Sequence, residues 1–353
     1  MFNRSLAPLV AIGVVLAAAA HAKTLRITVA ATPSETATFV GTFKRNVVPA
    51  IDSRLEQSGK GFRIRWTHAY AGKLARSDEI FEAVAQGIGG AGLILKDLEP
   101  ANLPLEAYAV HMPFTDVTRV QIVEVDAKLR SQVPELNQAY ERHNQVFIAS
   151  GASDSMQLFT RFPVTRVTDL RNRKLGASGS FALWLRGTGA IPVNAAVSRS
   201  RADIKEGVYE GYTIGIIPSY VHKTYAAARF FTRVDFGPTL TSAITFNGDV
   251  WNKIPAHARR IIREEAGKWS RYQTAVDLLK RSRFFGAMKS KGVAELTLSR
   301  SEREKWASLM PDIAQEWADR LDERGLPGTA LMTAYMDELR DRGVRIARHW
   351  DED

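Results

Sequence analysis

The chain of 353 residues contains no cysteine. Disulfide bridges, thiol catalysis and cysteine-based metal sites are therefore excluded. Internal repeats and low-complexity segments are also missing, which argues against a solenoid or a disordered tract. A chain of this length can bury enough apolar surface to build one or two large cores, and its stability must come from them.

Long apolar runs are absent except at the N-terminus. There Arg4 precedes an apolar run from Leu6 to Ala20, and the triplet A-H-A that closes it has the small-x-small pattern that signal peptidase cleaves. The run is too short and too rich in alanine for a stable membrane span, which needs roughly 20 apolar residues. We expect residues 1–22 to be a signal peptide that is cleaved after Ala22, so that the remainder is exported.

The formal net charge of +10 raises the possibility of a nucleic-acid partner. The cations are interspersed with acids, however, as in E-R-E-K-W and D-E-L-R-D-R. No arginine-rich arm and no row of stacking aromatic residues accompanies them. We interpret the charge as a basic, solvated surface and expect no nucleic acid to bind.

The sequence offers little that could catalyse a reaction. Its seven histidines include no pair at the spacing of helical metal ligands, so we predict neither a metal site nor a cofactor. The segment G-A-S-G-S around Ser178 is only loosely similar to a nucleophile elbow, because the G-x-S-x-G register fails. We predict that the protein is not an enzyme, and keep an exported serine hydrolase that uses Ser178 as the less favoured alternative.

Strand and helix patterns alternate through the first two thirds of the chain. Strands are predicted at residues 25–32, 62–70 and 90–95, with helical spacing between them, and the pattern resumes after Asn144. Such alternation predicts an α/β fold of two lobes, each a sheet flanked by helices. After Pro255 an amphipathic pattern continues for about eight turns at 3.6 residues per turn, which predicts one long helix able to run across both lobes.

Five segments stand in a recognisable order along the chain. They read A-G-K-L-A-R-S-D-E-I-F-E-A-V-A-Q-G, L-P-L-E-A-Y-A-V-H-M-P-F, F-P-V-T-R-V-T-D-L-R-N-R-K-L, E-G-V-Y-E-G-Y and F-N-G-D-V-W-N-K-I-P. Together, after a signal peptide, they resemble landmarks of the DctP-type periplasmic substrate-binding proteins of TRAP transporters (solute-binding protein family 7). The resemblance covers nearly the whole chain beyond the signal peptide.

The resemblance implies a monomeric two-lobe clamp in the periplasm that closes on a small organic anion. It further implies that a long helix braces both lobes and that the closed form delivers its solute to an inner-membrane TRAP permease. We expect lobe I to comprise residues 23–150 and about 238–283, and lobe II to comprise residues 151–237 and about 284–353 with the C-terminal helices. A related clamp that senses a ligand and acts on a membrane receptor remains an alternative.

The same resemblance places the ligand-binding residues, and here the chain departs from the family. The place of the arginine that binds a substrate carboxylate falls on Gly176, that of a second arginine near Met156, and that of an asparagine on Ile214. We therefore expect the usual carboxylate clamp to be missing and the site to be more apolar. The expected apolar walls are Met156, Phe181, Trp184 and Ile214, and the expected polar contacts are Arg76, Lys96, Gln157, Ser178 and Tyr212.

Overall fold

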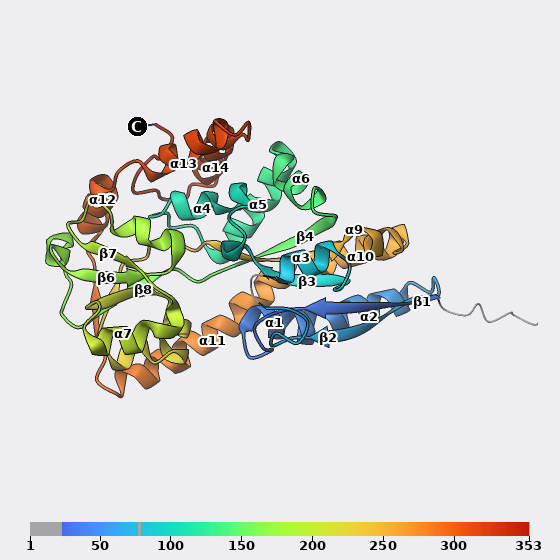
Figure 1. Cartoon of the computed structure of the whole chain (residues 1–353), viewed down its shortest axis with the longest axis horizontal. Helices are drawn as coiled ribbons and strands as arrows, with labels where there is room; N and C mark the ends of the chain where they lie inside the picture. Colours follow the sequence, from blue (N-terminus) through green and yellow to red (C-terminus); the bar gives the residue numbers. More distant parts are fainter. Residues whose placement is uncertain (1–22, 77–78, 353) are drawn as a thin grey trace, which may run out of the picture.

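The computed structural model describes residues 23–76 and 79–352. The signal peptide expected over residues 1–22 lies outside this part of the chain. Within the described residues, no helix is both long enough and apolar enough to cross a membrane. Two sheets with their helices form two lobes, which lie side by side in Figure 1.

Lobe I is built on a five-stranded sheet in the order β2-β1-β3-β10-β4. β1 is parallel to β2 and β3, whereas β10 is antiparallel to both β3 and β4. β3 is almost wholly buried, as expected for a central strand covered on both faces. The strands are β1 (Lys23–Ala30), β2 (Phe62–Ala69), β3 (Ala91–Leu95), β4 (Gln145–Ala152) and β10 (Leu240–Asn247).

Helices cover both faces of the lobe I sheet because its strands alternate apolar side chains between the two faces. Ile27 and Val29 of β1 pack in one core cluster, and Ala30 packs in another on the opposite face. The first face carries α1 (Thr38–Thr42), the π-helical turn η1 (Phe43–Val47), α2 (Val48–Gln57), α9 (Gly248–Asn252) and α10 (Ala256–Ala266). The second face carries α3 (Ile80–Ala85) and α6 (Glu135–Glu141).

Lobe II is built on a six-stranded sheet in the order β11-β9-β5-β8-β6-β7. β6 is parallel to β7 and β8, and β5 is antiparallel to β8 and β9. Both sheets are therefore mixed. The strands are β5 (Gln157–Thr160), β6 (Lys174–Ala177), β7 (Ile191–Asn194), β8 (Gly211–Ile214), β9 (Phe230–Arg233) and β11 (Ala294–Thr297).

One face of the lobe II sheet packs against short helices, and the other packs against elements shared with lobe I. The first face is covered by α7 (Ser200–Glu206), α8 (Ile216–Val221) and η7 (Thr224–Ala226). The shared core joins β5 and β6 to η4 (Val167–Leu170), η5 (Gly179–Leu185), α4 (Tyr108–His111), α5 (Arg119–Gln132), α12 (Arg300–Leu309), α13 (Ile313–Asp322) and α14 (Gly328–Asp341).

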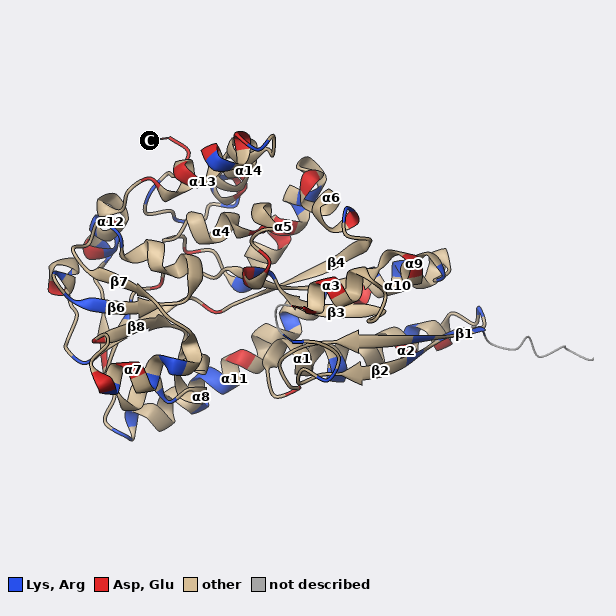
Figure 2. Ribbon diagram, viewed as in Figure 1, with Lys and Arg blue, Asp and Glu red and all other residues tan. Residues whose placement is uncertain are grey.

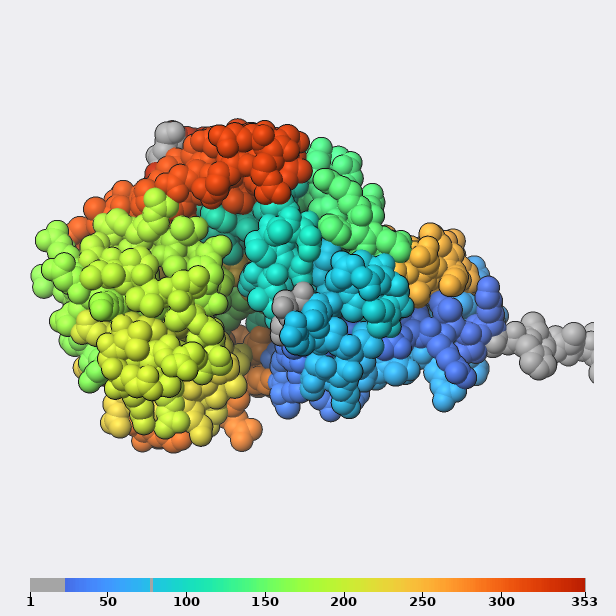
Figure 3. All heavy atoms as spheres, in the orientation of Figure 1, coloured from blue at the N-terminus to red at the C-terminus, as the bar shows by residue number. Residues whose placement is uncertain are grey.

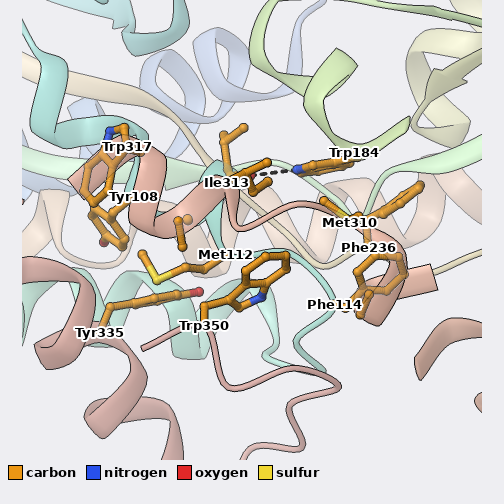
Figure 4. Close-up of a cluster of buried hydrophobic side chains, with 14 of the residues drawn as sticks. Tyr108, Met112, Phe114, Trp184, Phe236, Met310, Ile313, Trp317, Tyr335 and Trp350 are labelled. Carbon is orange, nitrogen blue, oxygen red and sulfur yellow. Dashed lines mark hydrogen bonds between the residues drawn. The ribbon is translucent and has the colours of Figure 1, made fainter. Parts of the chain in front are cut away.

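Two tryptophans, Trp184 and Trp306, connect the parts of this shared core, and Figure 4 labels the first of them. Nε1 of Trp306 in α12 donates to the carbonyl of Trp184 in η5, at 2.7 Å. Nε1 of Trp184 in turn donates to the carbonyl of Val110 in α4, also at 2.7 Å. Burying an indole is favourable only when its N–H finds an acceptor, and both rings meet that condition here. These two hydrogen bonds thus link the C-terminal helices to lobe II, and lobe II to α4.

The predicted single helix after Pro255 is wrong in one respect, because the structure has two helices there. α10 ends at Ala266, and α11 (Trp269–Lys289) begins after Gly267 and Lys268. The interruption turns the Trp269 ring into the lobe I core, where its Nε1 donates to the Phe39 carbonyl at 3.0 Å. Even without α10, α11 contacts α1 and β4 of lobe I and α8 of lobe II (Figure 1). The predicted brace across both lobes is therefore confirmed.

Candidate functional site

In each sheet, the parallel strands end at one edge. These two edges face each other. β4 leaves lobe I at Ala152, and β5 enters lobe II at Gln157 after a short crossing segment. Because β5 is antiparallel to β8 and β8 is parallel to β6, the start of β5 shares an edge with the ends of β6 and β8. Ligands of open α/β sheets bind at such edges. Figure 3 shows a hollow between the green and yellow lobe and the cyan and blue lobe, and we call it the cleft.

At Gly176, tyrosine rings occupy the space beside β6. Gly176 pairs with Tyr212 on the neighbouring strand. A Cβ at Gly176 would lie 2.5 Å from Cδ2 of Tyr212 and 2.9 Å from the ring of Tyr209. Tyr212 is fully buried and donates its hydroxyl to the Ala195 carbonyl. The side chain missing at position 176 is therefore replaced by aromatic packing, with no cavity left for a longer one.

Three more predicted residues meet at the same edge, but two of them face protein. Gln157 is buried, and its amide donates to Asp235 at 2.6 Å and accepts from the backbone N–H of Val234 at 2.8 Å. Ile214 is buried in the core on the α7 side. Met156 is half-buried, and its Sδ lies 4.0 Å from the position of a Cβ on Gly215 at the end of β8. Met156 is thus the member of this set with surface left for a ligand.

The residues after β6 also divide between cleft and core. Ser178 is half-buried, and its hydroxyl lies close enough to Tyr212 to oppose the rise that burial causes in the pKa of that phenol. Phe181 is half-buried and packs edge-on against Trp184, with 4.9 Å between ring centroids. Trp184 is fully buried in the shared core. In this conformation Trp184 cannot contact a solute, whereas Ser178 and Phe181 can.

The two predicted cations lie in opposite surroundings. Arg76 follows β2 and is exposed, with its guanidinium 2.8 Å from a carboxylate oxygen of Glu79. Lys96 follows β3 and is buried, with its Nζ 2.6 Å from Glu106 and 3.1 Å from the Ser150 hydroxyl. Lys96 therefore already has its ionic partner inside lobe I, and Arg76 is the predicted cation that a solute can reach.

Lys96 belongs to a buried group of four charges beside β3 and β4. Arg130 is bonded to Glu106 at 2.5 Å and to Asp126 at 2.9 Å, and Ser150 donates to Asp126 at 2.8 Å. Burial favours the protonated form of Asp126, but the charges of Arg130 and Lys96 outweigh it and hold the pKa of Asp126 below its ordinary value. Two cations and two carboxylates balance, so the group is a structural support for this end of lobe I.

α11 is bonded to the connections between the lobes. Asp277 accepts from Arg119 at the start of α5 at 2.5 Å and from the Thr38 hydroxyl at 2.6 Å. Arg281 donates to Asp154 in the crossing segment between β4 and β5 at 2.8 Å. A cavity of about 290 Å³ lies between α11 and the crossing segments, bordered by Arg119, Asp154, Asp277 and Arg281. The hinge is therefore a polar, ion-paired region.

The sequence analysis missed one polar residue at the lobe II edge. Asn194 ends β7, is exposed, and accepts a hydrogen bond from the backbone N–H of Gly179 at 2.9 Å. The signal that identifies it is the short apolar run I-P-V-N, over which no strand is predicted above. No cluster of metal-ligating side chains occurs among residues 23–76 and 79–352.

This arrangement, two lobes joined by crossing strands and a bracing helix around a cleft, is the architecture of a periplasmic solute-binding clamp. A family model described as bacterial extracellular solute-binding protein, family 7 (DctP), matches residues 53–320. Since the match covers most of the chain, the protein belongs to this family. No curated protein matches the chain.

Solved structures of TRAP solute-binding proteins share the fold. A TRAP periplasmic solute-binding protein from Desulfovibrio salexigens is 16% identical, with a TM-score of 0.77 over 90% of this chain and 97% of that chain. One from Rhodoferax ferrireducens, in complex with copurified benzoate, is 14% identical, with a TM-score of 0.73 over 90% and 98%. DctP6 of Bordetella pertussis, an extracytoplasmic solute receptor binding pyroglutamic acid, is 17% identical, with a TM-score of 0.69 over 89% and 100%.

Proposed function

We propose that this chain is the periplasmic solute-binding component of a TRAP transporter that captures a small organic acid in the cleft and delivers it to an inner-membrane permease. The observation that carries the proposal is the meeting of the two strand-end edges across a hinge, in a chain of this family. The sequence supports export, through the signal peptide expected over residues 1–22. The neighbours in complex with benzoate and pyroglutamic acid support an organic acid as the solute.

We further propose that the solute is not a conventional dicarboxylate. At Gly176 the aromatic packing of Tyr209 and Tyr212 leaves no room for a carboxylate-binding side chain. Losing one charge-assisted hydrogen bond costs about 1.5–3 kcal/mol, or roughly ten- to a hundredfold in affinity. The surfaces that remain beside β5 and β6 are Met156, Ser178 and Phe181, which suit a more apolar acid.

A thermal-shift screen tests the proposal with protein that starts at Lys23. A ligand at 100 times its dissociation constant stabilises by roughly 2.7 kcal/mol, enough to detect. We expect a shift with one or more monocarboxylates, and little shift with succinate, malate or fumarate at millimolar concentration. Ser178→Trp should abolish the shift by filling the cleft, while Ser282→Trp on the exposed side of α11 should retain it. A broad panel of organic acids without any shift would refute the proposal.

A further inference from the structure

A second cavity, of about 420 Å³, lies away from the hinge where η3 (Pro104–Ala107), η5 and α13 meet. Ser180 contributes from the segment after β6, and Pro100 contributes from the segment after β3, so the cavity adjoins both strand-end edges. Its remaining wall is α13, which belongs to neither sheet. The polar lining consists of His111, Ser180, Arg320, Glu323 and Arg324, and Trp317 lies among them.

Two buried rings line this cavity with polar atoms that have no protein partner. His111 is 5% exposed, and its Nδ1 lies 2.9 Å from the Ala107 carbonyl oxygen. A carbonyl only accepts, so Nδ1 carries the proton and Nε2 keeps a lone pair in the neutral ring. Trp317 stacks on His111 with 5.4 Å between ring centroids, and Figure 4 shows its nitrogen on the side away from Tyr108. Within the described part of the chain, neither His111 Nε2 nor Trp317 Nε1 has a hydrogen-bond partner.

The charged lining is cationic overall. Arg320 lies in the last turn of α13, and Arg324 follows that helix; both are exposed. Neither forms an ion pair with any residue that the structure describes, and Glu323 is the single carboxylate in the lining. The neighbouring Glu316 is held by both terminal nitrogens of Arg186, at 2.7 and 2.9 Å. Two guanidinium groups thus border the cavity beside one acid. Figure 2 shows acidic and basic residues interspersed on the C-terminal helices of this region.

We propose that this cavity binds a small hydroxy acid, with its carboxylate on Arg320 and Arg324 and its hydroxyl donating to Nε2 of His111. A guanidinium pairs with a carboxylate through two parallel N–H donors, which is strong recognition of such an anion at neutral pH. The proline and leucine side chains of the lining would contact the apolar part of the acid. The inference goes beyond the proposed function, because the lining of this cavity does not include the cleft residues Met156, Ser178 and Phe181.

Calorimetric titration with three matched probes tests this site. Mandelate has the carboxylate, the hydroxyl and an apolar ring; phenylacetate lacks the hydroxyl, and benzyl alcohol lacks the carboxylate. We expect mandelate to bind more tightly than either of the others. The double variant Arg320→Gln, Arg324→Gln should weaken mandelate binding by about tenfold or more. Arg283→Gln is the matched control, because it removes an exposed arginine of α11 outside the cavity and should change nothing.

His111→Phe separates the hydroxyl contact from the charge. The phenyl ring keeps the stacking on Trp317 but has no lone pair, so the preference for mandelate over phenylacetate should disappear. Absence of mandelate binding to the wild-type protein, or unchanged affinity in the arginine double variant, would overturn the inference. The proposed function would survive either result if the thermal-shift screen still finds an acid whose binding Ser178→Trp abolishes.

Discussion

Tyr212 occupies the space that a side chain at Gly176 would need. The two residues pair on adjacent parallel strands, and a Cβ on Gly176 would approach Cδ2 of Tyr212 to 2.5 Å. Real side chains do not tolerate such a contact, and the Tyr209 ring lies only 2.9 Å from the same Cβ position. The tight packing at position 176 is therefore a property of three residues together, and one substitution cannot open space for a longer side chain there.

Gly176→Ala should destabilise the protein by about 1–3 kcal/mol, because the added methyl group overpacks a closed aromatic site. The free energy of unfolding in urea measures the effect. Gly286→Ala is the control: a Cβ there meets nothing within 4 Å, and the position is helical. Alanine in that helix should be neutral or stabilising by up to about 1 kcal/mol. Equal stability of Gly176→Ala and wild type would contradict the packing described for Tyr212.

Arg130→Met should destabilise lobe I by about 3–5 kcal/mol, because it leaves Asp126 buried without its ion-pair partner and leaves Glu106 with Lys96 alone. Both carboxylates lie within 2.9 Å of the guanidinium. Arg300→Met, which removes an exposed partner of Glu304, should cost less than about 1 kcal/mol. Urea titrations of both variants provide the comparison, and similar losses would show that the buried charges do not act as a unit.

His111 should make the stability depend on pH. Burial lowers the pKa of His111 to about 4, and the charge of Arg320 contributes in the same direction. Between that value and the ordinary pKa of about 6.5, the unfolded chain binds more protons, so stability rises with pH. Acidification from pH 6.5 to 4 should thus cost roughly 3 kcal/mol through this residue.

The His111→Phe variant isolates this contribution, since phenylalanine does not titrate. The difference in unfolding free energy between wild type and variant should shrink or reverse as the pH falls from 7 to 4.5. A difference that is independent of pH would mean that His111 does not stay neutral in the folded protein. Other histidines with lowered pKa values, such as His222, affect both proteins equally and cancel.

The Asn247 side chain should contribute more to the free energy of unfolding than an ordinary helix cap does. Its side-chain oxygen accepts from the backbone N–H groups of Asp249 and Val250, while its amide donates to the carbonyls of Val84 and Ala85. A single cap contributes about 1 kcal/mol, and each buried group left unpaired adds about 1–3 kcal/mol. Asn247→Ala should therefore destabilise by about 2–4 kcal/mol. Ser299→Ala, at the exposed cap of α12, should cost about 1 kcal/mol in the same urea assay.

The two-lobe fold was predictable because the residue patterns that specify its strands and helices are local in the sequence. The alternation in F-R-I-R-W predicts a strand, and β2 shows the alternating burial that the pattern requires. The end of α10 was not predictable in the same way: no proline interrupts the pattern, and the break at Gly267 depends on seating Trp269 against Phe39 in a distant core. β7 was too short to stand out from its surroundings.

The candidate site was less predictable, because each side chain owes its direction to residues far along the chain. Lys96 follows a strand just as a ligand-binding cation would, yet Glu106 and Ser150 draw it into the lobe interior. Gln157 is turned inward by the backbone of Val234 in the same way. Local sequence places such residues at an edge, but the partners that decide their orientation come from other elements.

The series of bonds from Trp306 to Trp184 to Val110 constrains how the clamp can close. Elements bonded in this way move as one body, so α4 would travel with lobe II and the C-terminal helices although it precedes them in the chain. The rotation would then take place about the polar region between α11 and the crossing segments, where Asp277 pairs with Arg119 and Arg281 pairs with Asp154. α1 and α8, which both pack on α11, would then move little relative to each other. A solute bound beside α13 would be carried along with lobe II during closure, at a distance from the hinge.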